Sequence, residues 1–317
     1  MPEISVIMLT YNRINLLPRS IQSVLAQTFK EFEFIIIDNG STDGSASLCD
    51  KWAEKDDRII VIHRTKGNIG AGRNTGLEVA TGRYITFVDD DDRFEADMLE
   101  FLYQLALKYD ADISICGAVR EMEEGAEPKF VFKEEMVLNK VQGIHELLRR
   151  KFYSSGFPTK LFRREILQNF RFREDVKYED IYACYKCFAN AERIAIKGEP
   201  KYYCWRHEGN NSEFTTNDTL LEKNQLKLYL EAFKERTEYL SDIIPQEEAY
   251  YRYTEWSYMI SMCHKLLITN NIQCKEIYEE MKCILEKHLK EIEKSEYLMD
   301  FEKEWLAEIK EESLWVK

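Results

Sequence analysis

The sequence of 317 residues contains no uninterrupted apolar run of about 18 residues, the length that a membrane-spanning helix requires. Its first residues also lack the basic segment and the apolar segment of a secretory signal peptide. Basic residues are outnumbered, with 44 Lys and Arg against 57 Asp and Glu, so nucleic acid is not the expected main partner. We therefore expect a cytoplasmic protein whose 8 cysteines are reduced thiols.

Two common nucleotide-binding motifs are missing. No GxxxxGKS or GxxxxGKT segment occurs, which excludes a P-loop, and the predicted turn 10–13 has no glycine where a dinucleotide-binding fingerprint requires one. The segment 70–76 (GAGRNTG) is loosely similar to that fingerprint, but the polar residues 63–68 separate it from the strand before it. We therefore do not expect NAD(P) binding.

Paired cysteines at zinc-binding spacing are also lacking. Cys184 and Cys187 have CxxC spacing, but no second pair accompanies them and they fall within a helical pattern. We interpret both as structural thiols, with a metal or redox site as the alternative.

Short apolar runs alternate with helix-like patterns at the start of the chain. Such runs have the length of buried strands, whereas apolar residues at helical spacing, such as Leu17, Ile21 and Val24, indicate helices. The predicted strands are 4–9, 32–37, 59–62, 84–88 and 113–116, and the predicted helices are 16–25, 45–54 and 99–107, with 70–80 predicted as a loop that passes into a helix. Strands that alternate with helices indicate βαβ units, so we expect an α/β fold with a parallel sheet.

The pattern changes twice further along the chain. Residues 121–140 are charged and irregular, and we predict a surface excursion there. The segments that follow are predicted as helix 142–151, short helix 161–167, a helix from 178 through 188 and short strand 202–205. After these, helical patterns cover 220–239, 246–268 and 275–292. We therefore place a domain boundary near residue 216, with one domain over 1–215 and a helical region over 216–317.

An acidic run, Asp89 to Asp92, directly follows the predicted strand 84–88. Neighbouring carboxylates repel one another unless a cation neutralises them, and oxygen ligands suit Mg²⁺ or Mn²⁺. The alternatives are a solvated loop or a cap, with Asp92 at the N-terminus of the helix that follows. Ligands bind at the carboxyl ends of parallel strands, where residues 10–12 and 38–39 are polar as well. This coincidence favours a ligand site.

Four blocks in this order resemble the family 2 glycosyltransferases of the GT-A fold, particularly bacterial enzymes that build capsular and surface polysaccharides. The blocks are 5–12 (SVIMLTYN), 36–43 (IIDNGSTD), 68–76 (NIGAGRNTG) and 88–92 (VDDDD). Later segments that look similar are 160–164, 171–172, 178–180 and 205–206, so the resemblance covers about residues 3–212. It implies a Rossmann-like nucleotide-diphospho-sugar transferase fold, with a mixed, mainly parallel sheet flanked by helices. The resemblance does not cover the C-terminal region, which the helical patterns alone predict to be an all-helical appendage.

The resemblance implies nucleotide-binding roles for residues at the strand ends. Tyr11 would stack on a uracil ring, and Asp38 would accept a hydrogen bond from an N–H of the base. Arg73 would reach the nucleotide from the third loop, and Asp89 would lie near the ribose. The other residues that the resemblance assigns to nucleotide binding are Thr10, Asn12, Asn39 and Asp90.

The resemblance also implies which groups perform the transfer. Asp91, together with Asp89, would hold Mn²⁺ or Mg²⁺, because Asp91 takes the place of the last Asp of the family's DxD motif. Asp180 would be the general base and Glu179 would orient the site, although an acidic pair at a helix start also fits a helix cap. The residues assigned to the diphosphate or the acceptor are Arg206, His207 and Lys160, with a plain surface role as the alternative for the first two.

The implied function is that of an inverting, metal-dependent glycosyltransferase in bacterial surface polysaccharide synthesis. A hexose or N-acetylhexosamine would pass from a UDP-sugar to a saccharide acceptor, which we expect to be lipid-linked. The alternative is a non-catalytic nucleotide-sugar-binding partner subunit of another transferase. The aromatic-rich helical region would pack on the catalytic domain, form a homodimer, or contact the inner face of the cell membrane as a peripheral protein.

Overall fold

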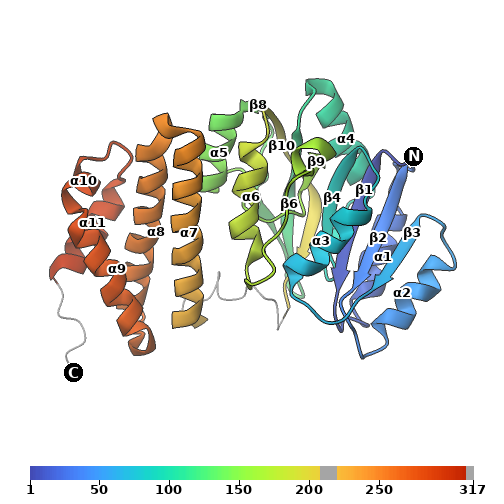
Figure 1. Cartoon of the computed structure of the whole chain (residues 1–317), viewed down its shortest axis with the longest axis horizontal. Helices are drawn as coiled ribbons and strands as arrows, with labels where there is room; N and C mark the ends of the chain where they lie inside the picture. Colours follow the sequence, from blue (N-terminus) through green and yellow to red (C-terminus); the bar gives the residue numbers. More distant parts are fainter. Residues whose placement is uncertain (208–219, 312–317) are drawn as a thin grey trace. The chain divides into compact units, whose positions relative to one another are not determined.

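The structure is a computed structural model that describes residues 1–207 and 220–311, and it divides into two compact units, Met1–His207 and Glu208–Lys317 (Figure 1). The first unit contains the sheet, and the described part of the second unit is helical. The domain boundary expected near residue 216 lies outside the described residues.

The first unit is built on a ten-stranded sheet (Figure 1). Its parallel part consists of β1 (Ile4–Thr10), β2 (Phe32–Asp38), β3 (Ile59–His63) and β4 (Tyr84–Asp89), in the spatial order β3-β2-β1-β4. Strands β1, β2 and β4 are apolar and buried along nearly all of their length, as expected for parallel strands that are covered on both faces. The predicted α/β sheet flanked by helices is confirmed.

Helices cover both faces of this parallel part. They are α1 (Leu17–Leu25), α2 (Ser45–Ala53), α3 (Ile69–Val79) and α4 (Met98–Tyr109). Val6 and Met8 of β1 belong to the core that α1 and α4 complete, whereas α3 packs on the opposite face against Ile7 and Leu9. A Cβ atom at Gly72 would lie 2.1 Å from Leu9 Cδ1. The glycine-rich sequence of α3 therefore allows this helix to approach β1 closely.

Beyond β4 the sheet is mixed. The additional strands are β5 (Arg93–Phe94), β6 (Ile113–Met122), β7 (Gly125–Lys129), β8 (Glu135–Asn139), β9 (Lys160–Arg163) and β10 (Arg193–Trp205). The helices between them are α5 (Lys140–Arg149), the 3-10 helix η1 (Arg164–Leu167) and α6 (Glu179–Ala189). The full strand order is β3-β2-β1-β4-β9-β6-β10-β5, with β7 paired to β6 and β8 paired to β10.

Three predictions for residues 121–205 are wrong. The segment 121–140 is not irregular, because β7 pairs with β6 and β8 pairs with β10. The short helix predicted over 161–167 is wrong only in its first half, because β9 inserts antiparallel between β4 and β6 and the 3-10 helix η1 begins only at Arg164. Strand β10 begins at Arg193 and not near Tyr202. Pairing with strands that are distant in the sequence decides the structure of these segments, and local residue patterns do not reveal it.

The cysteines of the CxxC sequence lie on α6, where both are buried and free. Burial raises the pKa of Cys184 to about 12. Because the thiolate is the form that binds metals and reacts, this environment disfavours a metal or redox site. This burial agrees with the interpretation of Cys184 and Cys187 as structural thiols.

The described part of the second unit consists of helices that pack around their own core (Figure 1). They are α7 (Lys223–Ile243), η4 (Pro245–Glu247), α8 (Glu248–Ile268), η5 (Ile272–Cys274), α9 (Lys275–Lys287), α10 (Leu289–Lys294) and α11 (Asp300–Glu311). Aromatic residues contribute to this core, since Trp256 and Tyr278 are buried and Tyr229 stacks on Tyr258 at a centroid distance of 6.0 Å. Within residues 1–207 and 220–311, no helix is both long and apolar enough to cross a membrane.

Candidate active site

The carboxyl ends of β1 to β4 meet at one edge of the sheet because these strands are parallel and in register. Thr10 pairs with Asp38, and Asp38 pairs in turn with His63. On the other side of β1, Leu9 pairs with Asp89. The polar strand ends singled out in the sequence are therefore neighbours, at the edge where open α/β sheets bind ligands.

Tyr11 follows β1 and is half-buried, with Lys66 Nζ lying 4.4 Å from the centroid of its ring. The next residue, Asn12, has a φ of 52°, in the left-handed region that Asn tolerates better than most residues. Its Oδ1 accepts a hydrogen bond from Thr42 N at 2.8 Å, which joins the turn after β1 to the turn after β2. Tyr11 thus presents an aromatic ring at the site, whereas Asn12 holds the turn after β1 and the turn after β2 together.

Asp38 is 3% exposed and is held from two sides. Its Oδ1 accepts a hydrogen bond from Ser41 N at 3.0 Å, and its Oδ2 lies 3.0 Å from Nδ1 of His63. Nε2 of His63 lies 2.9 Å from Oδ1 of Asp50. The hydrogen bonds to Asp38 and then to Asp50 raise the pKa of His63. His63 is the strand-end counterpart of Asp38, and this register is the signal by which sequence reasoning could have found it.

Asn39 is buried and engaged with the loop between β3 and α3. Its Nδ2 donates a hydrogen bond to Gly67 O at 2.7 Å, and Gly67 N donates one to its Oδ1 at 3.1 Å. Gly40 has a φ of 83°, and a Cβ atom there would lie 2.9 Å from Lys66 N. Asn39 and Gly40 therefore position the loop that places Lys66 over Tyr11.

The acidic tip, defined as Asp89 to Asp92, has a different partner for each carboxylate. Arg13 Nε lies 3.8 Å from Oδ1 of Asp90, and His207 Nε2 lies 3.1 Å from Oδ2 of Asp91. Burial raises the pKa of Asp90 to about 7. A bound cation would relieve this concentration of buried negative charge.

Asp92 connects the acidic tip to the end of β10. Its Oδ1 accepts a hydrogen bond from Trp205 N at 2.7 Å, and α4 begins only at Met98. The alternative in which Asp92 caps a helix is therefore wrong. Burial, followed by the charges of Asp89 and Asp91, raises the pKa of Asp92 well above its usual range.

Arg73 links the acidic tip to α6. The sequence analysis placed it in a loop, but it lies on α3 and is 8% exposed. Its Nη1 donates to Glu179 Oε1 at 2.6 Å, and its Nη2 donates to Asp89 Oδ1 at 3.3 Å. The guanidinium group lies 5.5 Å from the ring centroids of Phe87, Phe157 and Phe172. Arg73 thus joins carboxylates from a strand end and from a helix start in one buried ion cluster.

Asp180 lies in the first turn of α6 and is half-buried. Its Oδ2 accepts a hydrogen bond from Ser155 Oγ at 3.1 Å. The N-cap residue of α6 is Tyr178, which makes no capping hydrogen bond through its side chain. The acidic pair therefore does not form a side-chain cap, although its charge still interacts favourably with the helix N-terminus. Glu179 is bound by Arg73, while Asp180 next to it remains partly exposed.

The residues assigned to the diphosphate or the acceptor occupy different environments. Lys160 is fully buried and donates hydrogen bonds to backbone carbonyls, so it does not line an open acceptor site as expected. Arg206 donates its backbone N–H to Glu121 O at 2.8 Å. The side chain of His207 contacts the acidic tip through Asp91.

The chain matches the profile of a known protein family. The profile of "Glycosyl transferase family 2" matches residues 5–171, more than half of the chain. The chain belongs to glycosyl transferase family 2. The resemblance that its four sequence blocks indicated is thereby confirmed.

Individual glycosyltransferases are similar over different lengths. The glycosyltransferase GlyG of Streptococcus pneumoniae is 32% identical over 215 residues, which are 65% of this chain and 71% of the relative. The cholesterol galactosyltransferase of Borreliella burgdorferi is 28% identical over 88% of this chain and 80% of its own length. The chain spans a smaller share of other relatives, namely 30% of the length of the pneumococcal GlyA and 60% of the length of EpsJ from Bacillus subtilis.

Solved structures share the fold. The crystal structure of S. aureus TarS 1–349 in complex with UDP-GlcNAc has a TM-score of 0.63 and 19% identity, and the match covers 92% of this chain and 89% of that one. The predicted fold class is confirmed by this similarity together with the observed sheet.

Sequence analysis missed several residues of this glycosyltransferase that contact the predicted site residues. His63 and Lys66 lie at or just after a strand end, where sequence reasoning already expected ligand contacts. Ser155 contacts Asp180, and Tyr202 OH accepts a hydrogen bond from Asp89 N at 3.2 Å. Ser155 lies on the loop before β9 and Tyr202 lies on β10, in the part of the chain whose strand pairing is not visible in local patterns.

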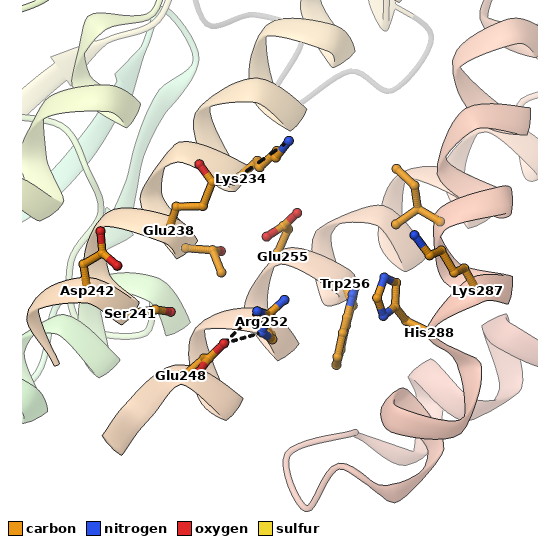
Figure 2. Close-up of a pocket in the computed structure, with 12 residues that line it drawn as sticks. Lys234, Glu238, Ser241, Asp242, Glu248, Arg252, Glu255, Trp256, Lys287 and His288 are labelled. Atoms are coloured by element: carbon orange, nitrogen blue, oxygen red, sulfur yellow. Dashed lines mark hydrogen bonds and ion pairs between the residues drawn. The ribbon is translucent and has the colours of Figure 1, made fainter. Parts of the chain in front are cut away.

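The helical unit of this family 2 protein has a cavity of about 580 Å³ among α7, α8 and α9 (Figure 2). Acidic and basic side chains both line it, among them Lys234, Glu238, Asp242, Glu248, Arg252, Glu255 and Lys287. Nη2 of Arg252 lies 2.7 Å from Oε1 of Glu248, and the Trp256 ring stacks on the His288 ring at a centroid distance of 5.6 Å. Because charges of both signs alternate around the cavity, its lining favours neither an anionic nor a cationic ligand.

Proposed function

We propose that the protein is an inverting glycosyltransferase that transfers a hexose or N-acetylhexosamine from a UDP-sugar to a saccharide acceptor. The ion cluster of Arg73 carries this proposal, because it connects Asp89 at the strand ends with Glu179, the neighbour of Asp180. A candidate base on α6 and the candidate nucleotide site therefore belong to one site. Membership of family 2 supports the reaction class.

The strand-end residues supply the contacts proposed for the nucleotide. Tyr11 provides a ring on which a base stacks, and Asp38 provides a buried carboxylate that accepts a hydrogen bond. Two solved TarS structures are complexes with UDP and UDP-GlcNAc, whereas the mannosyltransferase PcManGT of Pyrobaculum calidifontis, at a TM-score of 0.56, is a complex with GDP-Man and Mn²⁺. The fold thus accommodates different bases, and we favour uracil for this chain.

A divalent cation fits the donor chemistry of the acidic tip. Among the residues that the structure describes, no group of three or more His, Cys, Asp or Glu side chains is arranged to hold a metal ion without other ligands. Mg²⁺ is usually bound by one or two carboxylates together with substrate phosphates, so Asp91 and Asp89 are a sufficient protein contribution. When bound, Mn²⁺ or Mg²⁺ would stabilise the charge of the diphosphate as a Lewis acid. His207 would hold Asp91 in position through their 3.1 Å contact.

Asp180 is the proposed general base. A sugar hydroxyl is a weak nucleophile, so its proton must be removed as its oxygen bonds to the anomeric carbon and the bond to UDP breaks. A single displacement through an oxocarbenium-like transition state inverts the configuration at that carbon. Glu179 and Arg73 would fix the first turn of α6, which places the Asp180 carboxylate at the site.

The acceptor and the cellular setting belong to the same proposal. We expect a lipid-linked saccharide acceptor at the inner face of the cell membrane, in bacterial surface polysaccharide synthesis. A relative that is named for galactosyl transfer to cholesterol, which is itself a lipid, supports an acceptor located at a membrane. The helical unit would then provide a peripheral membrane contact or a homodimer interface.

A thermal-shift panel with UDP, GDP, CMP and NAD, each with and without Mn²⁺, tests the proposal. A ligand that binds only the native state raises the melting temperature, and we expect a shift with UDP that requires Mn²⁺. Asp91→Asn should abolish the metal-dependent shift. UDP release from UDP-glucose, UDP-galactose and UDP-N-acetylglucosamine, with octyl glycosides as acceptors, then measures turnover. Nucleotide binding without turnover would favour the partner-subunit alternative.

A further inference from the structure

Lys160 is a fully buried ammonium group in the middle of the sheet. It is 0% exposed at the start of β9, and its Nζ donates to Ser154 O at 2.8 Å and to Gly156 O at 2.5 Å. Burial lowers its pKa. A buried charge is costly unless hydrogen bonds compensate for it, and a methionine of similar length would fill the same space without that cost. The presence of lysine here therefore requires an explanation.

The two carbonyl groups that Lys160 binds lie on either side of Ser155. The Ser155 hydroxyl donates to Oδ2 of Asp180 at 3.1 Å. Just after this segment, Phe157 is fully buried against Phe87 and Phe172, with ring centroids 5.3 and 4.8 Å apart. Lys160 and Phe157 together fix the backbone of segment 154–157, and this backbone determines where the Ser155 hydroxyl lies.

We propose that Lys160 is a positioning residue for Asp180 that acts through Ser155. The ammonium group fixes the carbonyls of Ser154 and Gly156, and the Ser155 hydroxyl then holds the Asp180 carboxylate in the orientation that receives the acceptor proton. This inference rests on the proposed function, in which Asp180 is the base. A displacement of about 1 Å in a reacting group is enough to reduce turnover by about 10²-fold.

The variants Lys160→Met, Ser155→Ala and their combination test this proposal. We expect Ser155→Ala to reduce kcat by about tenfold and Lys160→Met by about tenfold to a hundredfold, with the Kd for UDP changed by less than about twofold. Because both changes act on the same carboxylate, the double variant should be no slower than Lys160→Met alone. A general structural role would instead multiply the two losses or weaken UDP binding, and either result overturns the proposal.

Lys201→Met is the matched control. Lys201 is also a buried lysine of this sheet, at 7% exposure, but its Nζ pairs with Asp97 and Glu199 and has no link to Asp180. We expect Lys201→Met to leave kcat within about twofold of the unchanged protein. If Lys201→Met slows turnover as much as Lys160→Met does, loss of a buried charge explains both and the proposal fails.

If Lys160→Met does not fold, Ser155→Thr still tests the proposal. Threonine retains the hydroxyl, so Ser155→Thr should recover most of the kcat that Ser155→Ala loses. Full activity of Ser155→Ala would contradict the proposal directly. The proposed function fails in a different way, namely if the unchanged protein releases no UDP from any UDP-sugar or if Asp180→Asn retains full kcat.

Discussion

The two halves of the first unit build their parts of the site differently. In the donor half, residues 4–92, the candidate nucleotide groups lie at neighbouring strand ends and are fixed by hydrogen bonds that join one strand-end turn or loop to the next, such as those of Asn12 and Asn39. In the acceptor half, residues 113–207, the candidate groups depend on side chains from distant segments, as Glu179 depends on Arg73 and Asp180 on Ser155. From this difference we predict that nucleotide binding, in the donor half, can be separated by mutation from proton transfer, in the acceptor half.

Asp180→Asn should have the largest effect and tests this separation most directly. Removal of a general base reduces turnover by about 10²-fold to 10⁴-fold, and we expect a loss of kcat of about 10³-fold. The Kd for UDP, measured by calorimetry, should change by less than about twofold, because Asp180 lies outside the donor half. Asp175→Asn is the control, since that acid is paired with Arg173 on the surface nearby. Loss of UDP affinity in proportion to kcat would show that the two halves are not separable.

The same comparison explains what the sequence could and could not predict. In the donor half, β1 to β4 and α1 to α4 follow the expected order, because each strand and helix carries its own residue pattern. The parallel register then brings Thr10, Asp38 and Asp89 together without further information. In the acceptor half, β7, β8 and β9 exist through pairing with strands far away in the sequence, which no local pattern encodes.

Individual site residues show the same limit of prediction from local sequence patterns. Asp180 could be singled out by resemblance, but its partner Ser155 lies 25 positions away on a loop without a distinctive pattern. The resemblance assigned Lys160 to the acceptor site, yet β9 places it in the interior. The resemblance also placed Arg73 on a loop, among the glycines of segment 70–76. Those glycines instead allow a helix to pack against Ile7 and Leu9.

Gly70→Ala should have the next largest effect, because α3 is where the two halves meet. A Cβ atom at Gly70 would lie 2.1 Å from the Arg173 carbonyl oxygen, a backbone atom that cannot easily move. Asn74 of α3 exchanges two hydrogen bonds with the backbone of Phe172 at 3.0 and 2.8 Å, so the contact is tight. We expect a loss of about 3 kcal/mol in the free energy of unfolding, measured by urea denaturation.

Gly156→Ala is the matched control for that substitution. A Cβ atom there would have no neighbour nearer than 3.8 Å, so its free energy of unfolding should change by less than about 0.5 kcal/mol. In Gly70→Ala, UDP affinity and kcat should fall together, unlike in Asp180→Asn, because both halves lose their common support. Unchanged stability of Gly70→Ala would mean that the halves do not depend on α3 for their alignment.

Tyr11→Ala should produce a smaller effect that is confined to the donor half. Stacking of a base on an aromatic side chain contributes about 1–3 kcal/mol, and displacement of Lys66 from the ring offsets part of this gain. We expect the Kd for UDP to rise by about tenfold, while kcat at saturating UDP-sugar changes by less than about twofold. Tyr11→Phe retains the ring and should bind UDP nearly as well as the unchanged protein. A loss of kcat at saturation would place Tyr11 in the chemical step and weaken the comparison.

His63→Gln should have the smallest effect, and the size of that effect depends on pH. Hydrogen bonds to Asp38 and Asp50 raise the pKa of His63, so the folded state favours the protonated ring. The stabilisation is fully present below the unfolded pKa of about 6.5 and is lost as the pH rises through the folded pKa.

The difference in melting temperature between the unchanged protein and His63→Gln should therefore be larger at pH 6 than at pH 8.5. It should correspond to less than about 1 kcal/mol, because the His63 side chain is 44% exposed and solvent screens the pair. Asp50→Asn, which removes the more exposed partner, should reproduce part of the difference. A pH-independent difference would mean that His63 supports Asp38 by packing alone.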